Sequence, residues 1–276
     1  MLIAEHKQVG LPNPNDLTTK TAIVSIDTMS HNPDVSVSRR RRRWRRLVAA
    51  AITLVILFVF AYGVKRVIQT RSWQVAGELV SRVETGDRVV ALTFDDGPTD
   101  ADADAVLDVL ADRDVPATFY VNGKDVEGNG STMQRIVEGG HEIGNHTWSH
   151  RPMAFVSPST VAEEIEPTDD AIRATGYDGP LTFRPPHGKK LLNLPLYLAK
   201  HDRLTVTWDV AYEDWSGNPQ SSADIVDATV DNTQPGSIIL LHPWFGRTTT
   251  QKAIGPVIDR LQDQGYRFVT VSELIE

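Results

Sequence analysis

The chain has 276 residues, among which 36 Asp and Glu outnumber 28 Lys and Arg, and it contains no cysteine. This length can build the core of one large domain or two small ones. The absence of cysteine excludes disulfides, thiolate zinc sites and cysteine nucleophiles, so any bound metal must be held by His and carboxylate side chains. Most acidic residues follow an apolar segment at 47–64. This argues against nucleic acid as a partner, because phosphate binding needs a basic face.

The N-terminal part is predicted to be a basic tail. Residues 1–38 have no hydrophobic periodicity and are rich in Asn, Pro, Ser, Thr and Asp, which is typical of disorder. The run RRRRRWRR follows at residues 39–46. Such a run can bind nucleic acid, but directly before an apolar segment it is typical of a cytoplasmic flank. We therefore predict that residues 1–46 form a disordered cytoplasmic tail.

The uncharged apolar run at residues 47–64 is long enough to cross a membrane as a helix. Trp44 and Tyr62 would then lie near the two interfaces. A cleaved signal peptide is the alternative, with a weak cleavage site at residues 59–61, although signal cores usually have about 7–15 residues. We expect a single-pass protein of the cell membrane with its N-terminus in the cytoplasm. Residues 65–87 would be a linker, and residues 88–276 an extracytoplasmic domain.

In that domain, strand-like and helix-like patterns alternate to the end of the chain. The predicted strands are residues 88–94, 117–121, 141–144, 181–184, 204–209, 237–241 and 268–271. The predicted helices are residues 103–113, 132–138, 159–174, 223–232 and 251–264, the third kinked or broken at Pro167. The alternation predicts an α/β fold with parallel strands, in a barrel or an open sheet. In both, functional groups gather at the carboxyl ends of the strands.

The first such end carries the motif TFDDGP at residues 93–98. The apolar run before it is typical of a buried strand, and Gly97 with Pro98 ends that strand. Asp95 and Asp96 are two adjacent carboxylates, which are costly to bury together as anions. A metal ion would remove this cost by binding one of them and leaving the other as a base. A polar turn after an edge strand is the alternative.

The second motif is HTWSH at residues 146–150. Its two histidines, His146 and His150, are four residues apart, so a helical turn would place both imidazoles on one face, within reach of one metal. His141 and Glu142 invite comparison with a zinc peptidase. That comparison fails, because the next histidine follows His141 by five residues rather than four and Gly144 would break the required helix.

Three further motifs are RPPHG at residues 184–188, which follows an apolar strand, WDVAYEDW at 208–215, and GSIILLH at 236–242, an apolar strand that ends with a histidine. Arg184 would project above its strand and orient Asp95. His242 ends the most apolar of these strands, which suits a general acid. Taken alone, the first of the three is a proline turn, and a histidine such as His242 commonly caps a buried strand.

Together and in this order, the five motifs resemble the polysaccharide deacetylase family with its NodB homology domain, from about residue 88 to the C-terminus. The resemblance implies a distorted (β/α) barrel and hydrolysis of N-acetyl, sometimes O-acetyl, groups on surface polysaccharides. It implies a divalent metal, commonly zinc, on Asp96, His146 and His150. It further implies the following roles: Asp95 as base, His242 as acid, Arg184 positioning Asp95, Asp214 pairing with His242, Trp215 and Leu240 walling the acetyl pocket, and a backbone N–H near Pro186 and His187 stabilising the oxyanion.

The sequence departs from the family pattern at two positions. His187 stands where the family usually has tyrosine, and Ala211 where many members have Asp. Neither change removes a residue with an assigned chemical role. We expect a metal-dependent deacetylase of an envelope or extracellular amino-sugar polymer, peptidoglycan or chitin-like. An O-acetyl esterase acting on xylan or another glycan, and an inactive carbohydrate-binding module, are the alternatives. No protein partner is predicted.

Overall fold

A computed structural model of the chain describes residues 33–212 and 221–276, with side chains described from residue 40 onward. The chain divides into two units, Met1–Ile56 and Leu57–Glu276. The second unit contains every described strand, so the fold below is that of this unit.

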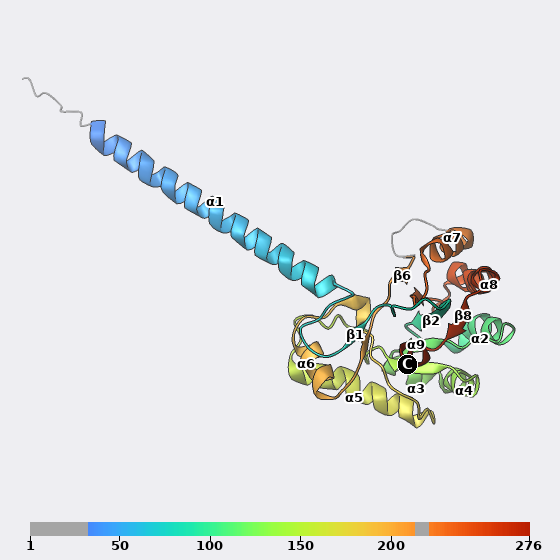
Figure 1. The fold of residues 1–276 in the computed structure, drawn as a ribbon. Helices are drawn as coiled ribbons and strands as arrows, with labels where there is room; N and C mark the ends of the chain where they lie inside the picture. The colour runs from blue at the N-terminus through green and yellow to red at the C-terminus, as the bar shows by residue number, and fades with distance from the viewer. Residues whose placement is uncertain (1–32, 213–220) are drawn as a thin grey trace, which may run out of the picture. The chain divides into compact units, whose positions relative to one another are not determined.

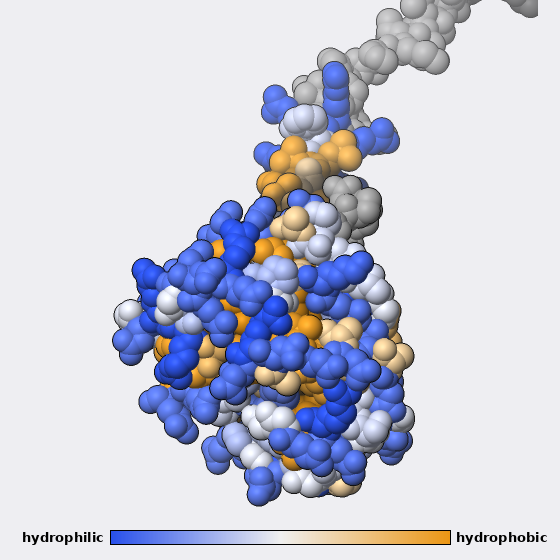
Figure 2. Space-filling view, turned by 90° about the vertical axis from the view of Figure 1, so that its right-hand side faces the viewer, coloured by the Kyte–Doolittle hydropathy of each residue, from blue (hydrophilic) through white to orange (hydrophobic). Residues whose placement is uncertain are grey.

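The first described element is the helix α1, Pro33–Gln69. Its part from Arg40 to Gln69 is long and apolar enough to cross a membrane, a test that a signal sequence also passes. Along it, basic residues are followed by apolar ones (Figure 2), and large apolar side chains such as Phe58 at 72% are exposed. Exposed apolar surface of this extent favours contact with lipid. The helix includes residues 33–46, which the sequence analysis assigns to a disordered tail, and it ends five residues beyond the predicted end at 64.

The strands of the second unit are short and parallel wherever they pair in ladders. They are β1 Leu79–Val80, β2 Val89–Asp95, β3 Thr118–Val121, β4 Glu142–Asn145, β5 Thr205–Val206, β6 Val210–Ala211, β7 Ile238–Leu241 and β8 Arg267–Val269. The order in the larger sheet is β4-β3-β2-β7-β6, and β8 also pairs with β2. β2 is therefore the central strand. It pairs with β8 along its first residues, Val89–Ala91, and with β3 along its last, Thr93–Asp95.

The smaller sheet pairs β1 with β5, and isolated bridges connect it to the larger one. Phe183 bridges both Asn145 of β4 and Thr205 of β5, and Arg82 bridges Ser237 before β7. The parallel α/β class is as predicted. The expected barrel is not confirmed. Within residues 33–212 and 221–276, the strands form two separate sheets that are connected only by isolated bridges, and they do not form one closed sheet.

Helices connect the strands (Figure 1). They are α2 Ala103–Ala111, α3 Gly123–Gly128, α4 Gly130–Glu138, α5 Pro158–Ala174, α6 Asn193–Lys200, α7 Ser222–Asn232, α8 Thr248–Asp263 and α9 Val271–Ile275, with 3-10 turns η1 Asp100–Asp102 and η2 Pro186–Gly188. Of the kink or break predicted at Pro167, the break does not occur, since α5 continues through this residue. Ser157 stabilises the start of α5 by accepting a hydrogen bond from the Thr160 N–H.

Several predicted strands are shorter than the sequence pattern indicates. Residues 181–184 form bridges but no strand, and residues 204–209 keep only β5. Val271 begins α9 rather than ending β8. β1 lies inside the predicted linker 65–87, where a two-residue strand leaves no periodic signal.

The two faces of β2 have different neighbours, and this difference positions the site. Val90, Leu92 and Phe94 pack into the larger core, formed with residues of α2, α4, α7 and α8. Ala91 belongs to a second cluster that includes Leu240 and is closed by residues of α9. Because successive side chains of a strand point to opposite faces, Thr93 and Asp95 face the same side as Ala91.

Candidate active site

The two aspartates of the first motif lie at the carboxyl end of the central strand. Asp95 is the last residue of β2 and is 2% exposed, whereas Asp96 is 8% exposed and has a φ of 71°. A left-handed residue interrupts the alternation of a strand, and Asp is among the few residue types that tolerate this conformation. As a result, both carboxylates approach the same imidazole, with Asp95 Oδ2 at 3.6 Å and Asp96 Oδ1 at 3.8 Å from His146 Nε2.

The two histidines of the second motif converge, but not on a helical turn as the spacing predicts. Residues 146–150 follow β4 as an irregular loop in which Thr147 and His150 have positive φ values of 72° and 59°. His150 Nε2 lies 3.2 Å from Asp96 Oδ1. Glu164 of α5 holds the loop by accepting hydrogen bonds from the N–H and hydroxyl of Ser149. The sequence pattern gave no indication of this contact.

The surroundings of the His146 imidazole favour its neutral form. Its Nδ1 lies 2.8 Å from the carbonyl oxygen of Arg184, and the ring is buried. Burial, together with nearby His150, keeps the pKa of His146 well below its usual value. The ring is therefore neutral at physiological pH, which is the form that binds a metal.

Asp96, His146 and His150 fit a divalent metal. One oxygen or nitrogen from each lies within 4.8 Å of the others. Asp96 Oδ1 is buried without a hydrogen-bond partner, although such an atom normally has one. A carboxylate oxygen with no partner, facing two imidazole nitrogens, is the donor set that a divalent ion such as zinc would satisfy.

Arg184 joins the site although its segment is not a strand. The chain at residues 182–184 runs between β4 and β5, with Arg184 N–H donating to the Asn145 carbonyl. The guanidinium is fully buried and donates to Asp95 Oδ1 at 2.6 Å and to Thr93 Oγ1 at 2.7 Å. It also donates to the Thr207 carbonyl and stacks on the ring of Tyr120 at 4.0 Å. Asp95 is thus held at one oxygen by a buried cation.

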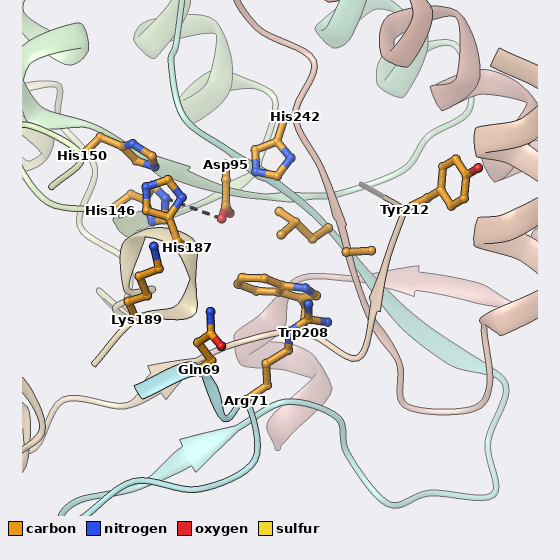
Figure 3. A pocket seen from close by; sticks show the side chains of 12 residues that line it. Gln69, Arg71, Asp95, His146, His150, His187, Lys189, Trp208, Tyr212 and His242 are labelled. Carbon is orange, nitrogen blue, oxygen red and sulfur yellow. Dashed lines mark ion pairs between the residues drawn. The ribbon is translucent and has the colours of Figure 1, made fainter. Parts of the chain in front are cut away.

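Asp95, His146 and His150 line a cavity of about 250 Å³, whereas Asp96 and Arg184 do not reach its surface. Figure 3 shows Asp95 between the histidines His146 and His150 on one side and His242 on the other. His242 and Leu240 come from the end of β7, the strand next to β2. The lining consists of Gln69, Arg71, Asp95, His146, His150, His187, Lys189, Trp208, Ala211, Tyr212, Leu240 and His242.

The remaining predicted site residues divide into three groups. His187 lines the cavity, and its ring meets that of His150 edge-on with centroids 4.8 Å apart. Burial lowers the pKa of His187 from its usual value. Pro186 is buried and does not line the cavity. Asp214 and Trp215 lie outside the described residues.

Six lining residues were not assigned a role from the sequence, namely Gln69, Arg71, Lys189, Trp208, Tyr212 and Ala211, the last noted only as a departure from the family pattern. Trp208 and Tyr212 belong to a motif that the sequence analysis singled out, so their aromatic character was an available signal. Gln69 and Arg71 fall in the predicted linker, where no pattern marks them. Only the folded chain brings this segment to the cavity.

Comparison with known proteins identifies the family. Residues 82–207 match the polysaccharide deacetylase family. The chain is 35% identical over 190 residues to a peptidoglycan-N-acetylglucosamine deacetylase of Bacillus cereus, covering 68% of each protein. It is also 35% identical over 195 residues to the peptidoglycan-N-acetylmuramic acid deacetylase PdaC of Bacillus subtilis, covering 70% of this chain but 40% of that protein.

Solved structures with this fold include both active and inactive proteins. A family 4 acetyl xylan esterase from Clostridium thermocellum, in complex with cobalt, is 35% identical with a TM-score of 0.62, over 68% of this chain and 90% of that one. A CE4 family pseudoenzyme from Bacillus anthracis is 25% identical with a TM-score of 0.65, over 71% and 68% of the two chains. On the match to the B. cereus enzyme and to the family over residues 82–207, the chain belongs to the polysaccharide deacetylase family of hydrolases.

Proposed function

We propose that the chain is a metal-dependent deacetylase that removes N-acetyl groups from an amino-sugar polymer of the cell envelope. One arrangement carries this proposal. The donor atoms of Asp96, His146 and His150 lie together next to Asp95, which Arg184 holds, and His242 lines the same cavity. The site thus contains candidates for a metal centre, a base and an acid around a space that can admit an acetyl group.

Asp96, His146 and His150 would hold the metal, which we propose to be zinc. When bound, such an ion lowers the pKa of a coordinated water toward neutral pH and polarises the acetyl carbonyl as a Lewis acid. A three-residue donor set leaves coordination positions open, as catalytic sites require. The family relative from C. thermocellum was solved with cobalt, which supports a divalent ion at this kind of site.

Asp95 is the proposed base. Its Oδ1 accepts a hydrogen bond from Arg184, while Oδ2 lies toward His146, where the attacking water would be. Oδ2 would therefore take the proton of the water as its oxygen attacks the acetyl carbonyl. Arg184 keeps the carboxylate in this orientation, and a main-chain N–H near His187 would stabilise the negative charge that develops on the carbonyl oxygen.

His242 is the proposed acid. An amide nitrogen is a poor leaving group, so it must receive a proton when the carbon–nitrogen bond breaks. His242 lines the cavity across from His146 and His150, where it would face the sugar side of the amide (Figure 3). Its proton would produce the free amine, and the acyl group would leave as acetate. We further propose that Asp214 pairs with His242 and that Trp215 joins Leu240 around the acetyl methyl group.

The proposed substrate is peptidoglycan. Two relatives that are 35% identical are peptidoglycan deacetylases. The apolar part of α1 would anchor the protein as a single-pass membrane protein with its arginine-rich flank in the cytoplasm and residues 88–276 outside. Such an anchor would hold the active site beside the wall polymer.

The test is acetate release by the purified chain from chitooligosaccharides, peptidoglycan fragments and acetylated xylan, with and without chelator and added zinc. Release from an amino sugar that stops with chelator and returns with zinc is the expected result. Release only from xylan would instead support an O-acetyl esterase. The C. thermocellum esterase, which has this fold, is the observation that favours that second candidate.

A binding module without activity is separated from both enzymes by metal content. The family contains a pseudoenzyme, so the fold alone does not decide the matter. The complete group of Asp96, His146 and His150 supports an active protein. We expect one divalent ion per chain by elemental analysis. A chain without metal that binds glycan but releases no acetate would support the binding module.

A further inference from the structure

We propose that residues 68–71, which connect the apolar helix to the folded domain, form one wall of the substrate cavity through Gln69 and Arg71, and so confine the enzyme to glycan at the membrane surface. This inference rests on the proposed function and on α1 acting as a membrane anchor. It gives the segment a role in recognition that the sequence does not indicate, since residues 65–87 have the composition of a linker.

The first observation is that the segment is firmly attached to the domain. Lys190 is buried, and its ammonium donates to the Thr70 carbonyl at 2.6 Å while its backbone N–H donates to the Ile68 carbonyl. The Thr207 hydroxyl donates to the Arg71 carbonyl at 2.6 Å. These contacts involve main-chain atoms of the segment, and Ile68 itself is buried. The segment therefore has a defined path beside the cavity.

The second observation is what this path presents to the cavity. Gln69 and Arg71 both line it, and the guanidinium of Arg71 stacks on the Trp208 ring, 4.7 Å from the ring centroid. Figure 3 shows Gln69, Arg71 and Trp208 together on one side of the cavity, away from His242. The amide of Gln69 and the guanidinium of Arg71 are hydrogen-bond donors that suit the hydroxyl and acetamido oxygens of a sugar.

Trp208 adds an independent indication of a ligand. It is 6% exposed, and its indole Nε1 is buried without a hydrogen-bond partner. A buried donor of this kind normally has a partner. Trp208 also lines the cavity, so this donor without a partner belongs to the same wall as Gln69 and Arg71.

The few residues between the apolar run and this segment limit the distance between the cavity wall and the membrane. α1 continues from the apolar run ending at Val64 to Gln69, five residues further. Five residues span about 8 Å along a helix, and no more than about 18 Å even when fully extended. The cavity wall thus lies within the depth of the lipid headgroups and the adjoining layer. We infer that the natural substrate is an N-acetylated glycan close to the lipid surface, including glycan attached to a lipid.

The wall is tested by binding of chitooligosaccharide to the purified full-length chain in detergent, treated with chelator so that no turnover occurs. Substituting Gln69→Ala and Arg71→Ala together should raise Kd at least about tenfold. Because the segment is attached through main-chain atoms, the double variant should keep the circular dichroism spectrum and the melting temperature of the wild type. Arg66→Ala, which removes the same charge from a residue outside the cavity lining, should bind as wild type does.

A Kd of the double variant within twofold of the wild-type Kd would contradict the proposal that Gln69 and Arg71 form a substrate-binding wall. Failure of the wild type to bind any N-acetylated glycan would contradict it as well. Because binding is measured without turnover, the result is separate from the proposed function. If the wild type binds glycan but releases no acetate once zinc is restored, the proposed deacetylase function is contradicted. The binding result for the proposed wall still holds in that case.

Confinement is tested by inserting about 12 Gly and Ser residues between Arg66 and Val67, which adds a reach of about 20 Å without altering residues 68–71. In proteoliposomes, the wild type should release acetate at least about tenfold faster from lipid-linked glycan than from intact wall sacculi. The insertion should reduce that preference, and both proteins should treat soluble oligosaccharide alike. The same preference in both proteins, or no preference in the wild type, would overturn confinement.

Discussion

The carbonyl oxygen of Arg184 lies 2.8 Å from Nδ1 of His146. A carbonyl oxygen can only accept a hydrogen bond, so Nδ1 must carry the proton and the lone pair of Nε2 faces the aspartates. The guanidinium of the same arginine holds Asp95. One residue thus orients both a proposed metal ligand and the proposed base, which is how outer contacts tune a metal site.

Replacing the proposed base should separate metal binding from turnover. In Asp95→Asn the three donors Asp96, His146 and His150 are unchanged, so the metal should stay while acetate release falls about 10²–10⁴-fold, the usual contribution of a positioned proton acceptor. His146→Ala should lose both metal and activity. Elemental analysis and acetate release on the same samples check this. Near wild-type activity in Asp95→Asn would show that another group is the base.

Removing Arg184 should destabilise the fold as well as reduce activity. Arg184→Met leaves the buried Asp95 carboxylate without its cation, which typically costs about 3–5 kcal/mol. The double variant Arg184→Met with Asp95→Asn should recover much of this stability, because the unpaired charge is gone, but no activity. Urea unfolding of the two single variants and the double variant measures the coupling. Additive losses would mean that the ion pair itself is not the cause.

The role of His242 can be tested through the leaving group. His242→Ala should lower acetate release from an N-acetyl sugar about 10²–10⁴-fold, because the amine needs a proton to leave. An activated aryl acetate needs no such proton, so its hydrolysis should change little. Equal losses on the two substrates would indicate that His242 shapes the cavity rather than donating a proton.

A buried histidine outside the site predicts how stability changes with pH. Burial lowers the pKa of His141 to about 4 from 6.5. Between these values the unfolded chain binds a proton that the folded chain does not, so stability is lost as pH falls from about 6.5 to about 4. The loss from this residue is at most about 3 kcal/mol. His141→Asn retains an acceptor for the Ala117 N–H, so its unfolding free energy should depend less on pH. An identical pH dependence would contradict this prediction.

Two truncations should differ because of residues 68–71. Deleting residues 39–64 removes the apolar segment and should release a soluble, active domain that retains Gln69 and Arg71. A chain beginning at residue 72 lacks the partners of Lys190 and Thr207. It should melt at a lower temperature and show a higher KM for oligosaccharide. Equal melting temperature and KM would mean that the segment contributes neither stability nor binding, and an insoluble first product would mean that residues 39–64 belong to the fold.

Much of the site was predictable from the sequence because it depends on strand ends. Asp95 ends one apolar strand and His242 follows its neighbour, and parallel strands bring such ends to one edge of the sheet. His146 and His150 were correctly expected to converge near Asp96, although for the wrong reason. Their loop relies on positive φ angles at Thr147 and His150 and on Glu164, none of which a spacing of four residues reveals.

By itself, the sequence determined the apolar helix, the alternating α/β class, and the residue types that can hold a metal and transfer protons. These follow from local patterns, because periodicity and composition depend on neighbouring residues. Only the tertiary structure decided that Arg184 contacts both Asp95 and His146, and that residues 68–71 line the cavity with Trp208. These contacts join segments more than thirty residues apart and depend on buried hydrogen bonds such as that from Lys190 to the Thr70 carbonyl. Such bonds exist only once the chain has excluded water from them.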